Sequence, residues 1–193
     1  EYRTAHPLAG ALDLIRGLLL PGSPEDSGVI VAVGDHAGRL LWVEGDLQKR
    51  MLSGQMGFVE GANWSEAAVG TSAPGTALAL GEAVQIHHAE HYNRLVQPWS
   101  CTAAPVFDPE TRRILGVIDV TGGTEAATPQ ARMLVDATAR AVESELLVAR
   151  LRARAEASAP SRPTPRRARP AVPVRARLQV LGRDRALLEI DGA

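Results

Sequence analysis

The sequence predicts an α+β fold with one antiparallel sheet that is bracketed by a first and a last helix. Three observations support this prediction. Strand-like runs come in pairs, and each pair is separated by a short stretch of turn formers. Helical periodicity flanks these runs on both sides within residues 1–156. Hydrophobic residues make up 45% of the 193 residues, which is enough for one medium-sized domain to bury a core.

The first predicted element is a helix that ends at Pro21-Gly22, because apolar residues recur before it at steps of four and three. These residues are Leu8, Leu12, Ile15 and Leu19. The runs GVIVAV (28–33) and RLLWVEG (39–45) follow, and GDHAG between them indicates a β-hairpin. Residues 46–56 have a helical pattern.

A third strand is predicted over AVQIHH (83–88), with Gly81 ending the segment before it. The runs SCTAAPVF (100–107) and ILGVIDVTG (114–122) then form a second hairpin, because Asp108-Pro109 between them is typical of a turn. The sheet therefore has five predicted strands.

The longest helix is predicted from Pro129 to about Ala155, a stretch without glycine or internal proline that follows the potential cap Thr128. Its apolar residues step by four and three: Val135, Ala139, Val142, Leu146, Ala149 and Ala153. This spacing is closer to a coiled-coil seam than to a helix lying on a sheet, and Leu147 and Leu151 add a second apolar edge. We therefore expect a homodimer through the terminal helices. The alternative is that the stripe packs only on its own sheet.

The first domain is expected to end at residue 156. Residues 157–173 contain five prolines, four arginines and no acidic residue, which predicts an extended linker. Its arginines contact DNA phosphates in one interpretation and are simply solvated in the other. Residues 174–193 predict a β-hairpin around GRDR, either the start of a truncated output domain or an arm that pairs with another element.

Charge and cysteine content narrow the class of protein. Residues 1–153 hold 12 basic and 18 acidic side chains, whereas residues 154–193 hold 9 and 4, so the charge is split along the chain. No apolar stretch approaches the roughly 20 residues of a membrane-spanning helix, and no leader peptide is visible. The sole cysteine, Cys101, forms no internal disulfide, which fits a reducing compartment. These features predict a cytoplasmic protein without membrane contact.

The run NWSEAAVGTSAPGTALALGEAVQIHH (63–88) is unusually rich in glycine, alanine and hydroxyl side chains. We expect residues 46–97, here called the roof, to cover the sheet face opposite the terminal helices and to enclose a ligand pocket. Trp64 is a candidate wall, and Thr71 and Thr76 offer hydroxyls at little steric cost. The alternative for each hydroxyl is helix capping or tight packing.

Asp119 is a candidate recognition residue. The alternation in VIDVT puts Val117, Asp119 and Thr121 on one face of the sheet. A carboxylate on the inner side of a central strand is costly unless it is paired, so we expect it to accept hydrogen bonds from a ligand hydroxyl or from roof amides.

Two histidines and the cysteine suggest that the domain could bind a metal ion or use a reactive thiol. His87 and His91 lie four residues apart beside Glu90, but the run before them is strand-like, so the imidazoles need not share a face. A zinc site also needs a third ligand, for which Cys101 and Asp119 are candidates. We expect no metal and instead a histidine hydrogen bond to ligand or backbone. Cys101 is expected to be a buried inert thiol; the alternatives are a nucleophile, a redox sensor or a soft ligand.

The segments FVEGANWSEAAVGTSAPGTALALGEAVQIHHAEHY (58–92) and QPWSCTAAPVFDPETRRILGVIDVTGG (97–123) resemble the GAF domain of bacterial transcriptional activators related to the acetoin-responsive regulator of acetoin catabolism. The resemblance implies a cytoplasmic sensor with a six-stranded antiparallel sheet and helices on both sides. Such a domain binds a small molecule and passes the signal to an output domain that contacts DNA. The phosphate-loop pattern G-x-x-x-x-G-K-[ST] is absent from the sequence, so ATP-driven remodelling is not assigned to this chain.

We therefore predict a non-enzymatic sensory GAF domain, without a cofactor, that binds a small and largely uncharged metabolite and signals through dimer helices. The candidate ligand-binding residues are Trp64, Thr71, Thr76, Gln85, His87, His91, Trp99, Cys101 and Asp119. The main alternative is a metal- or redox-based gas sensor that uses the histidine, cysteine and aspartate side chains. A catalytic domain with Cys101 as nucleophile and a collapsed pocket that serves only dimerisation are further alternatives.

Overall fold

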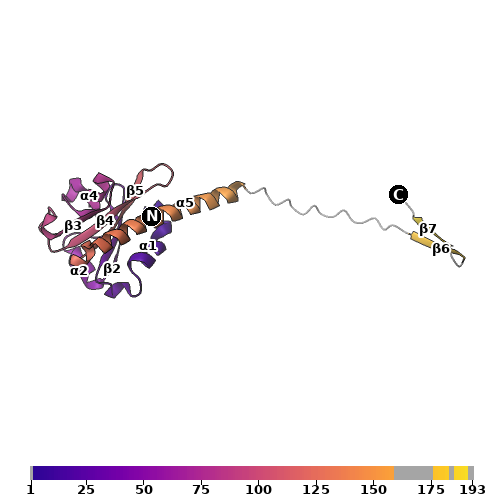
Figure 1. Cartoon of the computed structure of the whole chain (residues 1–193), viewed down its shortest axis with the longest axis horizontal. Coiled ribbons are helices and arrows are strands. Elements are labelled where there is room, and N and C mark those ends of the chain that lie inside the picture. The colour runs from indigo at the N-terminus through magenta and orange to yellow at the C-terminus, as the bar shows by residue number, and fades with distance from the viewer. Residues whose placement is uncertain (1, 159–175, 183–184, 191–193) are drawn as a thin grey trace. The chain divides into compact units, whose positions relative to one another are not determined.

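A computed structural model describes residues 2–158, 176–182 and 185–190. The chain divides into two compact units, Glu1–Ala157 and Ser158–Ala193, which are described separately. Figure 1 shows the first unit as a sheet with helices on both faces. Among the described residues, no helix is both long and apolar enough to cross a membrane.

The first unit is built on a five-stranded antiparallel sheet with the order β2-β1-β5-β4-β3. The strands are β1 (Ile30–Asp35), β2 (Leu40–Gly45), β3 (Val84–His87), β4 (Ser100–Phe107) and β5 (Ile114–Gly122). The α+β class, both hairpins and the separate third strand are confirmed. Within the described residues the sheet has one strand fewer than the GAF resemblance implies.

The terminal helices cover one face of the sheet (Figure 1). They are η1 (Pro7–Ala11), α1 (Leu12–Leu19) and α5 (Pro129–Ser158). Val135, Ala139 and Val142 of α5 are buried in the same apolar cluster as Ile15 and Ile118. The coiled-coil interpretation is therefore wrong for this part of the stripe, because the sheet of the same chain already covers it. The homodimer stays a prediction.

The distal part of α5 is tied to the turn between β4 and β5 by four charged side chains, here called the charge clamp. Arg150 Nη1 donates to Asp108 Oδ1 at 3.1 Å, and its Nη2 also donates to the Asp108 carboxylate. Arg154 Nη1 lies 2.7 Å from Glu110 Oε1. The hydrogen bond from Arg150 holds the pKa of Asp108 well below its usual range.

The variant Arg150→Ala is expected to loosen the end of α5 without disturbing the sheet. Amides of residues 147–158 should exchange with deuterium several-fold faster, because this part of the helix loses one of its two arginine contacts with the turn. Arg140→Ala is the matched control, since the partner of Arg140 is Asp136 within α5 itself, at 3.2 Å. Equal exchange in the two variants would show that the charge clamp does not hold the helix.

The roof covers the other face of the sheet with short helices. They are α2 (Leu47–Gly54), α3 (Glu66–Val69), α4 (Ala73–Leu80) and η3 (His88–Glu90); η2 (Pro24–Asp26) and η4 (Thr124–Ala127) lie outside the roof segment. Apolar side chains beneath the roof form two separate clusters. The first contains Ile30, Ala32, Leu40, Val43, Phe58, Trp64 and Val96, and the second contains Ala73, Ala77, Val84, Ile86, Cys101, Ala103 and Val117.

The small residues of the roof serve close packing. A Cβ atom on Gly75 would lie 2.6 Å from the Glu66 nitrogen and 2.8 Å from the Trp64 oxygen, so α4 needs glycine to touch the chain before α3. Gly70 has a φ of +74° and leaves room for the ring of Tyr92. The glycine and alanine content that suggested a pocket thus has a packing explanation at these positions.

The second unit contains an antiparallel hairpin of β6 (Ala176–Gly182) and β7 (Arg185–Ile190). The predicted linker begins within α5, which reaches Ser158; its remainder, 159–173, lies outside the described residues. The linker arginines 162, 166, 167 and 169 and the centre of the GRDR turn also lie outside them.

Candidate functional site

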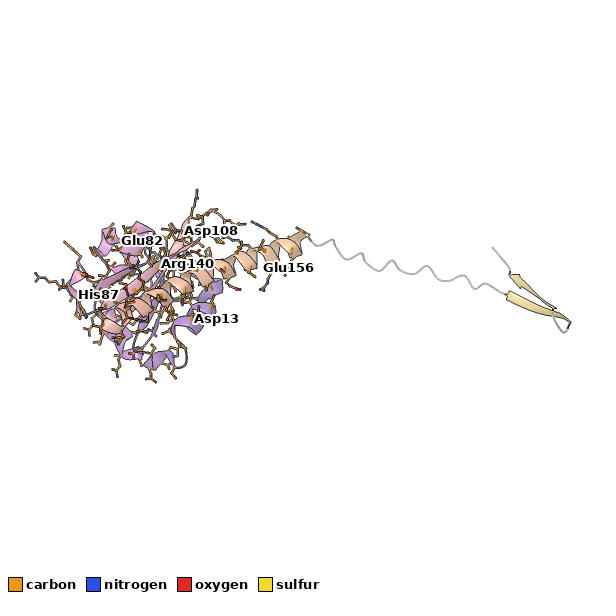
Figure 2. The ribbon with its side chains drawn as sticks, in the orientation of Figure 1. Asp13, Glu82, His87, Asp108, Arg140 and Glu156 are labelled. Carbon is orange, nitrogen blue, oxygen red and sulfur yellow. The ribbon has the colours of Figure 1, made fainter. Side chains whose placement is uncertain are left out.

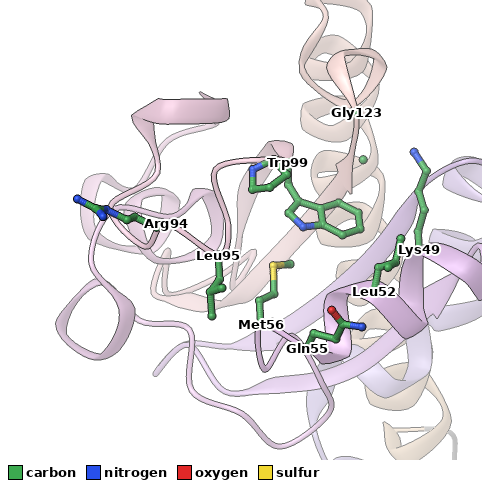
Figure 3. Close-up of a pocket in the computed structure, with 10 residues that line it drawn as sticks. Lys49, Leu52, Gln55, Met56, Arg94, Leu95, Trp99 and Gly123 are labelled. Carbon is green, nitrogen blue, oxygen red and sulfur yellow. The ribbon is translucent and has the colours of Figure 1, made fainter.

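A pocket of about 530 Å³ opens at the edge of the roof, and it is here called the roof-edge pocket. Its walls come from α2, from the segment after η3 and from the end of β5 (Figure 3). The lining residues are Lys49, Leu52, Gln55, Met56, Arg94, Leu95, Pro98, Trp99, Gly122 and Gly123. Leu52 and Leu95 are 54% and 64% exposed, so the pocket offers apolar surface to a ligand.

One of the two basic side chains in the lining, Lys49, is already paired. Lys49 Nζ donates to Glu125 Oε1 at 2.8 Å, and the Gly123 amide donates to the same oxygen at 2.8 Å. Burial raises the pKa of Glu125, but these hydrogen bonds outweigh burial and bring the pKa to about 2. The lining contains no acidic side chain, and its charge is partly neutralised by Glu125.

Three buried polar side chains lie beneath the roof on neighbouring strands, and they are here called the polar seam. Asp119 and Thr121 belong to β5, and Cys101 lies opposite Thr121 on β4. The Thr121 hydroxyl lies 2.6 Å from Asp119 Oδ2 and 3.2 Å from Cys101 Sγ. Because a hydroxyl has one proton, Thr121 donates to the carboxyl group, which is the stronger acceptor.

Burial changes the proton affinity of both acidic groups in the polar seam. It raises the pKa of Asp119 to about 7, and the hydrogen bond from Thr121 offsets only part of this effect. Burial and the nearby Asp119 also raise the pKa of the Cys101 thiol well above its ordinary value. A protonated, buried thiol is a poor nucleophile, which weighs against the catalytic alternative.

Asp119 also has an unmet hydrogen-bonding capacity. The side chain is 0% exposed, and Oδ1 has no hydrogen-bond partner. On the neighbouring strands it pairs with Ala32 and Ala103, which belong to different apolar clusters. Asp119 therefore lies where the two roof-side clusters meet.

Trp99 connects the roof-edge pocket to this region. Its half-buried side chain lines the pocket and packs against both roof-side clusters, the second of which contains Cys101. Trp99, Cys101 and Asp119 are the candidate site residues that the structure brings into one region.

Other candidate residues have structural partners elsewhere in the roof. Trp64 is buried, donates through Nε1 to the Gly57 oxygen at 3.1 Å and packs edge-to-face on Phe58. The Thr76 hydroxyl donates to Glu66 Oε1 at 3.2 Å. The backbone oxygen of Thr71, a half-buried residue, accepts from the Tyr92 amide at 3.1 Å. These contacts favour the packing interpretation, and a ligand role for Trp64, Thr71 and Thr76 stays a prediction.

Gln85 lies on the opposite face of the sheet. Its Nε2 donates to Thr102 Oγ1 at 3.0 Å and to the Thr128 oxygen at 2.8 Å, beneath the start of α5. The assignment of Gln85 to a site under the roof is therefore wrong. The cause is strand alternation, since Val84 and Ile86 take the roof side of β3.

The histidines do not converge. His87 is exposed at the margin of the domain (Figure 2), and its amide donates to Glu90 Oε2 at 2.6 Å. His91 is buried; its Nδ1 donates to the His88 oxygen at 3.0 Å, and its Nε2 has no partner. Burial lowers the pKa of His91. In the described part of the chain, no three His, Cys, Asp or Glu side chains are grouped to hold a metal ion. The metal-sensor alternative therefore has no ligand set there.

Sequence reasoning missed most of the roof-edge pocket, including Met56, Leu52 and Leu95. The only signal in the sequence was the presence of Leu47, Met51 and Leu52 in one short helix; that all three are more than half exposed is known only from the structure. Apolar residues on the outer side of a short helix indicate a surface used for binding.

Comparisons with known proteins agree with this architecture. The family model described as MimR, N-terminal domain, matches residues 23–145. A Rhodococcus erythropolis protein, named an uncharacterized 47.3 kDa protein in the thcA 5′ region, is 54% identical over 146 residues, which are 76% of this chain and 33% of that protein. The acetoin dehydrogenase operon transcriptional activator AcoR of Bacillus subtilis is 38% identical over 128 residues, 66% of this chain and 21% of AcoR.

A solved structure, the E. coli DhaR(N)-DhaL complex, contains a similar chain. The TM-score is 0.69 at 26% identity, over 81% of this chain and 52% of that chain. A roofed antiparallel sheet with a long final helix thus defines a GAF-like sensory domain of the kind found at the N-terminus of transcriptional activators. The chain belongs to the MimR N-terminal domain family. It spans 33% and 21% of the two curated relatives described above.

Proposed function

We propose that this domain is the effector-binding part of a cytoplasmic transcriptional regulator and that a small, largely uncharged molecule binds in the roof-edge pocket. One observation carries the proposal: the apolar pocket opens beside Trp99, which packs against both clusters that hold the roof on the sheet. A ligand at this position contacts the roof and the end of β5 together. The volume of about 530 Å³ lies in the usual range for small-molecule sites.

The names of relatives support the choice of ligand class. They refer to operons for acetoin dehydrogenase, propane 2-monooxygenase and dihydroxyacetone kinase. Acetoin, propane and dihydroxyacetone are small uncharged molecules. An apolar pocket whose lysine is already paired suits molecules of this kind better than it suits ions.

In this proposal the ligand brings α2 and residues 94–99 together, and β5 passes the change to the charge clamp on α5. The helix then carries the signal, within a homodimer, to a DNA-binding output region. The domain itself has no catalytic role. Signal transfer requires that the ligand bind one arrangement of the roof better than another.

The proposal predicts that short-chain ketones, alcohols or diols raise the melting temperature of the 193-residue chain, because a ligand that binds only the folded state stabilises it. Leu95→Asp should reduce the rise to less than a quarter, since it puts a charge in the apolar lining. The matched control is Leu80→Asp, because Leu80 is 60% exposed on α4 and Leu95 is 64% exposed. The proposal fails if no compound stabilises the wild-type chain, or if both variants respond as it does.

A further inference from the structure

We infer that Asp119 is the polar recognition group of this sensory domain, and that its unpartnered carboxyl oxygen binds a hydroxyl or carbonyl group of a neutral ligand. The apolar part of the same ligand occupies the roof-edge pocket. This inference rests on the proposed function and names the residue that selects the ligand and the chemistry it selects.

The first step is the contrast between two buried aspartates. Asp35 is 3% exposed, and its carboxylate accepts hydrogen bonds from the Ala37 and Arg39 amides at 2.9 Å each and from the Tyr2 hydroxyl at 3.0 Å. Asp119 is 0% exposed, yet Thr121 satisfies only its Oδ2. A buried carboxyl oxygen without a partner costs free energy, so the fold retains a group that a bound molecule can satisfy.

The second step is the surroundings of that oxygen. The residues directly beside Asp119 on the neighbouring strands are Ala32 and Ala103, the smallest side chains that a strand offers apart from glycine. They belong to separate apolar clusters, and Trp99 packs against both of these clusters. Trp99 also lines the roof-edge pocket. Because Asp119 is closed to solvent, a ligand reaches it only when side chains around it move, and Trp99 is the pocket residue that packs on both clusters.

The third step is the chemistry that the polar seam accepts. A ligand carboxylate would place two acidic groups together in an apolar environment, which is unfavourable. An ammonium group brings three donors, and besides Asp119 the seam offers only the hydroxyl of Thr121 and the thiol of Cys101, which already interact. A hydroxyl donates one hydrogen bond to the ionised carboxylate, and a carbonyl accepts one from the protonated acid. Short-chain alcohols, diols and hydroxy ketones match this capacity.

The test compares Asp119→Leu and Asp119→Asn with the wild-type chain. The neutral probes are acetoin and 2-propanol, with propionate and isopropylamine as charged counterparts. Binding is followed by thermal shift and by tryptophan fluorescence, because Trp99 borders the pocket. Without ligand, Asp119→Leu should melt at the same or a higher temperature, since it removes an unpartnered polar atom. It should bind the neutral probes at least tenfold more weakly, and Asp119→Asn should also bind them more weakly.

Asp35→Asn is the matched control, because it changes a buried aspartate whose partners all lie within the chain. It should lower the melting temperature but keep the ligand-induced rise. If both Asp119 variants bind the neutral probes like the wild type while Leu95→Asp abolishes binding, the inference about Asp119 is wrong and the proposed function stands. If propionate or isopropylamine binds more tightly than the neutral probes, the ligand chemistry is wrong. If no probe binds the wild-type chain, both the proposed function and the inference about Asp119 are wrong.

Discussion

The wild-type domain is expected to lose a contribution to stability as the pH rises from about 4 to about 7, and Asp119→Asn should remove this loss. Burial raises the pKa of Asp119 to about 7 in the folded chain, whereas an exposed aspartate has a pKa of about 3.9. Below about pH 4 both states hold the proton. Between the two pKa values only the folded state holds it, so each pH unit favours unfolding by about 1.4 kcal/mol. The whole effect is at most about 4 kcal/mol.

The measurement is urea unfolding of wild type and Asp119→Asn at several pH values from 4 to 8. The comparison uses the difference between the two proteins, because other carboxylates act in the opposite direction. The hydrogen bonds from Arg16 lower the pKa of Glu44, so Glu44 stabilises the fold above its unfolded pKa, and this contribution is lost as the pH falls. A difference that stays constant between pH 4 and pH 7 would contradict a raised pKa for Asp119.

Gly116→Ala is expected to be a strongly destabilising substitution in the sheet. A Cβ atom at this position would lie 2.1 Å from the Gly34 oxygen and 2.8 Å from Leu8 Cδ1. The Gly34 oxygen belongs to the backbone of β1, which pairs with β5 along its whole length, so it moves only if that pairing is disturbed. We expect a loss of about 3 kcal/mol or more in the free energy of unfolding.

The control for this substitution is Gly17→Ala in α1. A Cβ atom there meets no heavy atom within 4 Å, and Gly17 is exposed within a helix. Because alanine favours helix more than glycine does, this variant should gain about 1 kcal/mol. Chemical denaturation of both variants checks the pair, and a Gly116→Ala loss below about 1 kcal/mol would show that the sheet adapts.

Local signals were enough to predict most of the fold. Alternation of apolar residues placed Asp119 and Thr121 on the same side of β5, where the structure has them. The capping role of Thr128 was also readable, and its hydroxyl accepts from the Ala131 amide at 3.1 Å. These features depend on residues close together in the sequence.

The predictions that were wrong or missing depend on contacts between residues that are far apart in the sequence. Alternation separates Gln85 from Ile86, but it does not say which face of the sheet lies under the roof. The periodicity of α5 is the same whether the stripe meets its own sheet or another helix. The roof-edge pocket joins α2, Leu95 and Gly122, which are far apart in the sequence, so no single run of residues predicted it.

Strand β5 runs from the roof-edge pocket to the hairpin turn that contacts α5. Gly122 at the end of the strand lines the pocket. In the turn before the strand, Arg112 Nη1 donates a hydrogen bond to Glu143 Oε2 of α5 at 3.1 Å. The amide of Phe107, at the end of β4, donates to Glu143 Oε1 at 2.9 Å. The helix is thereby anchored in its middle as well as near its end. The hairpin itself is held on both sides, because β5 pairs with β1 and β4 pairs with β3. Any displacement of α5 against the sheet therefore has to break polar contacts at two places along the helix, as well as the apolar contacts of Val135, Ala139 and Val142.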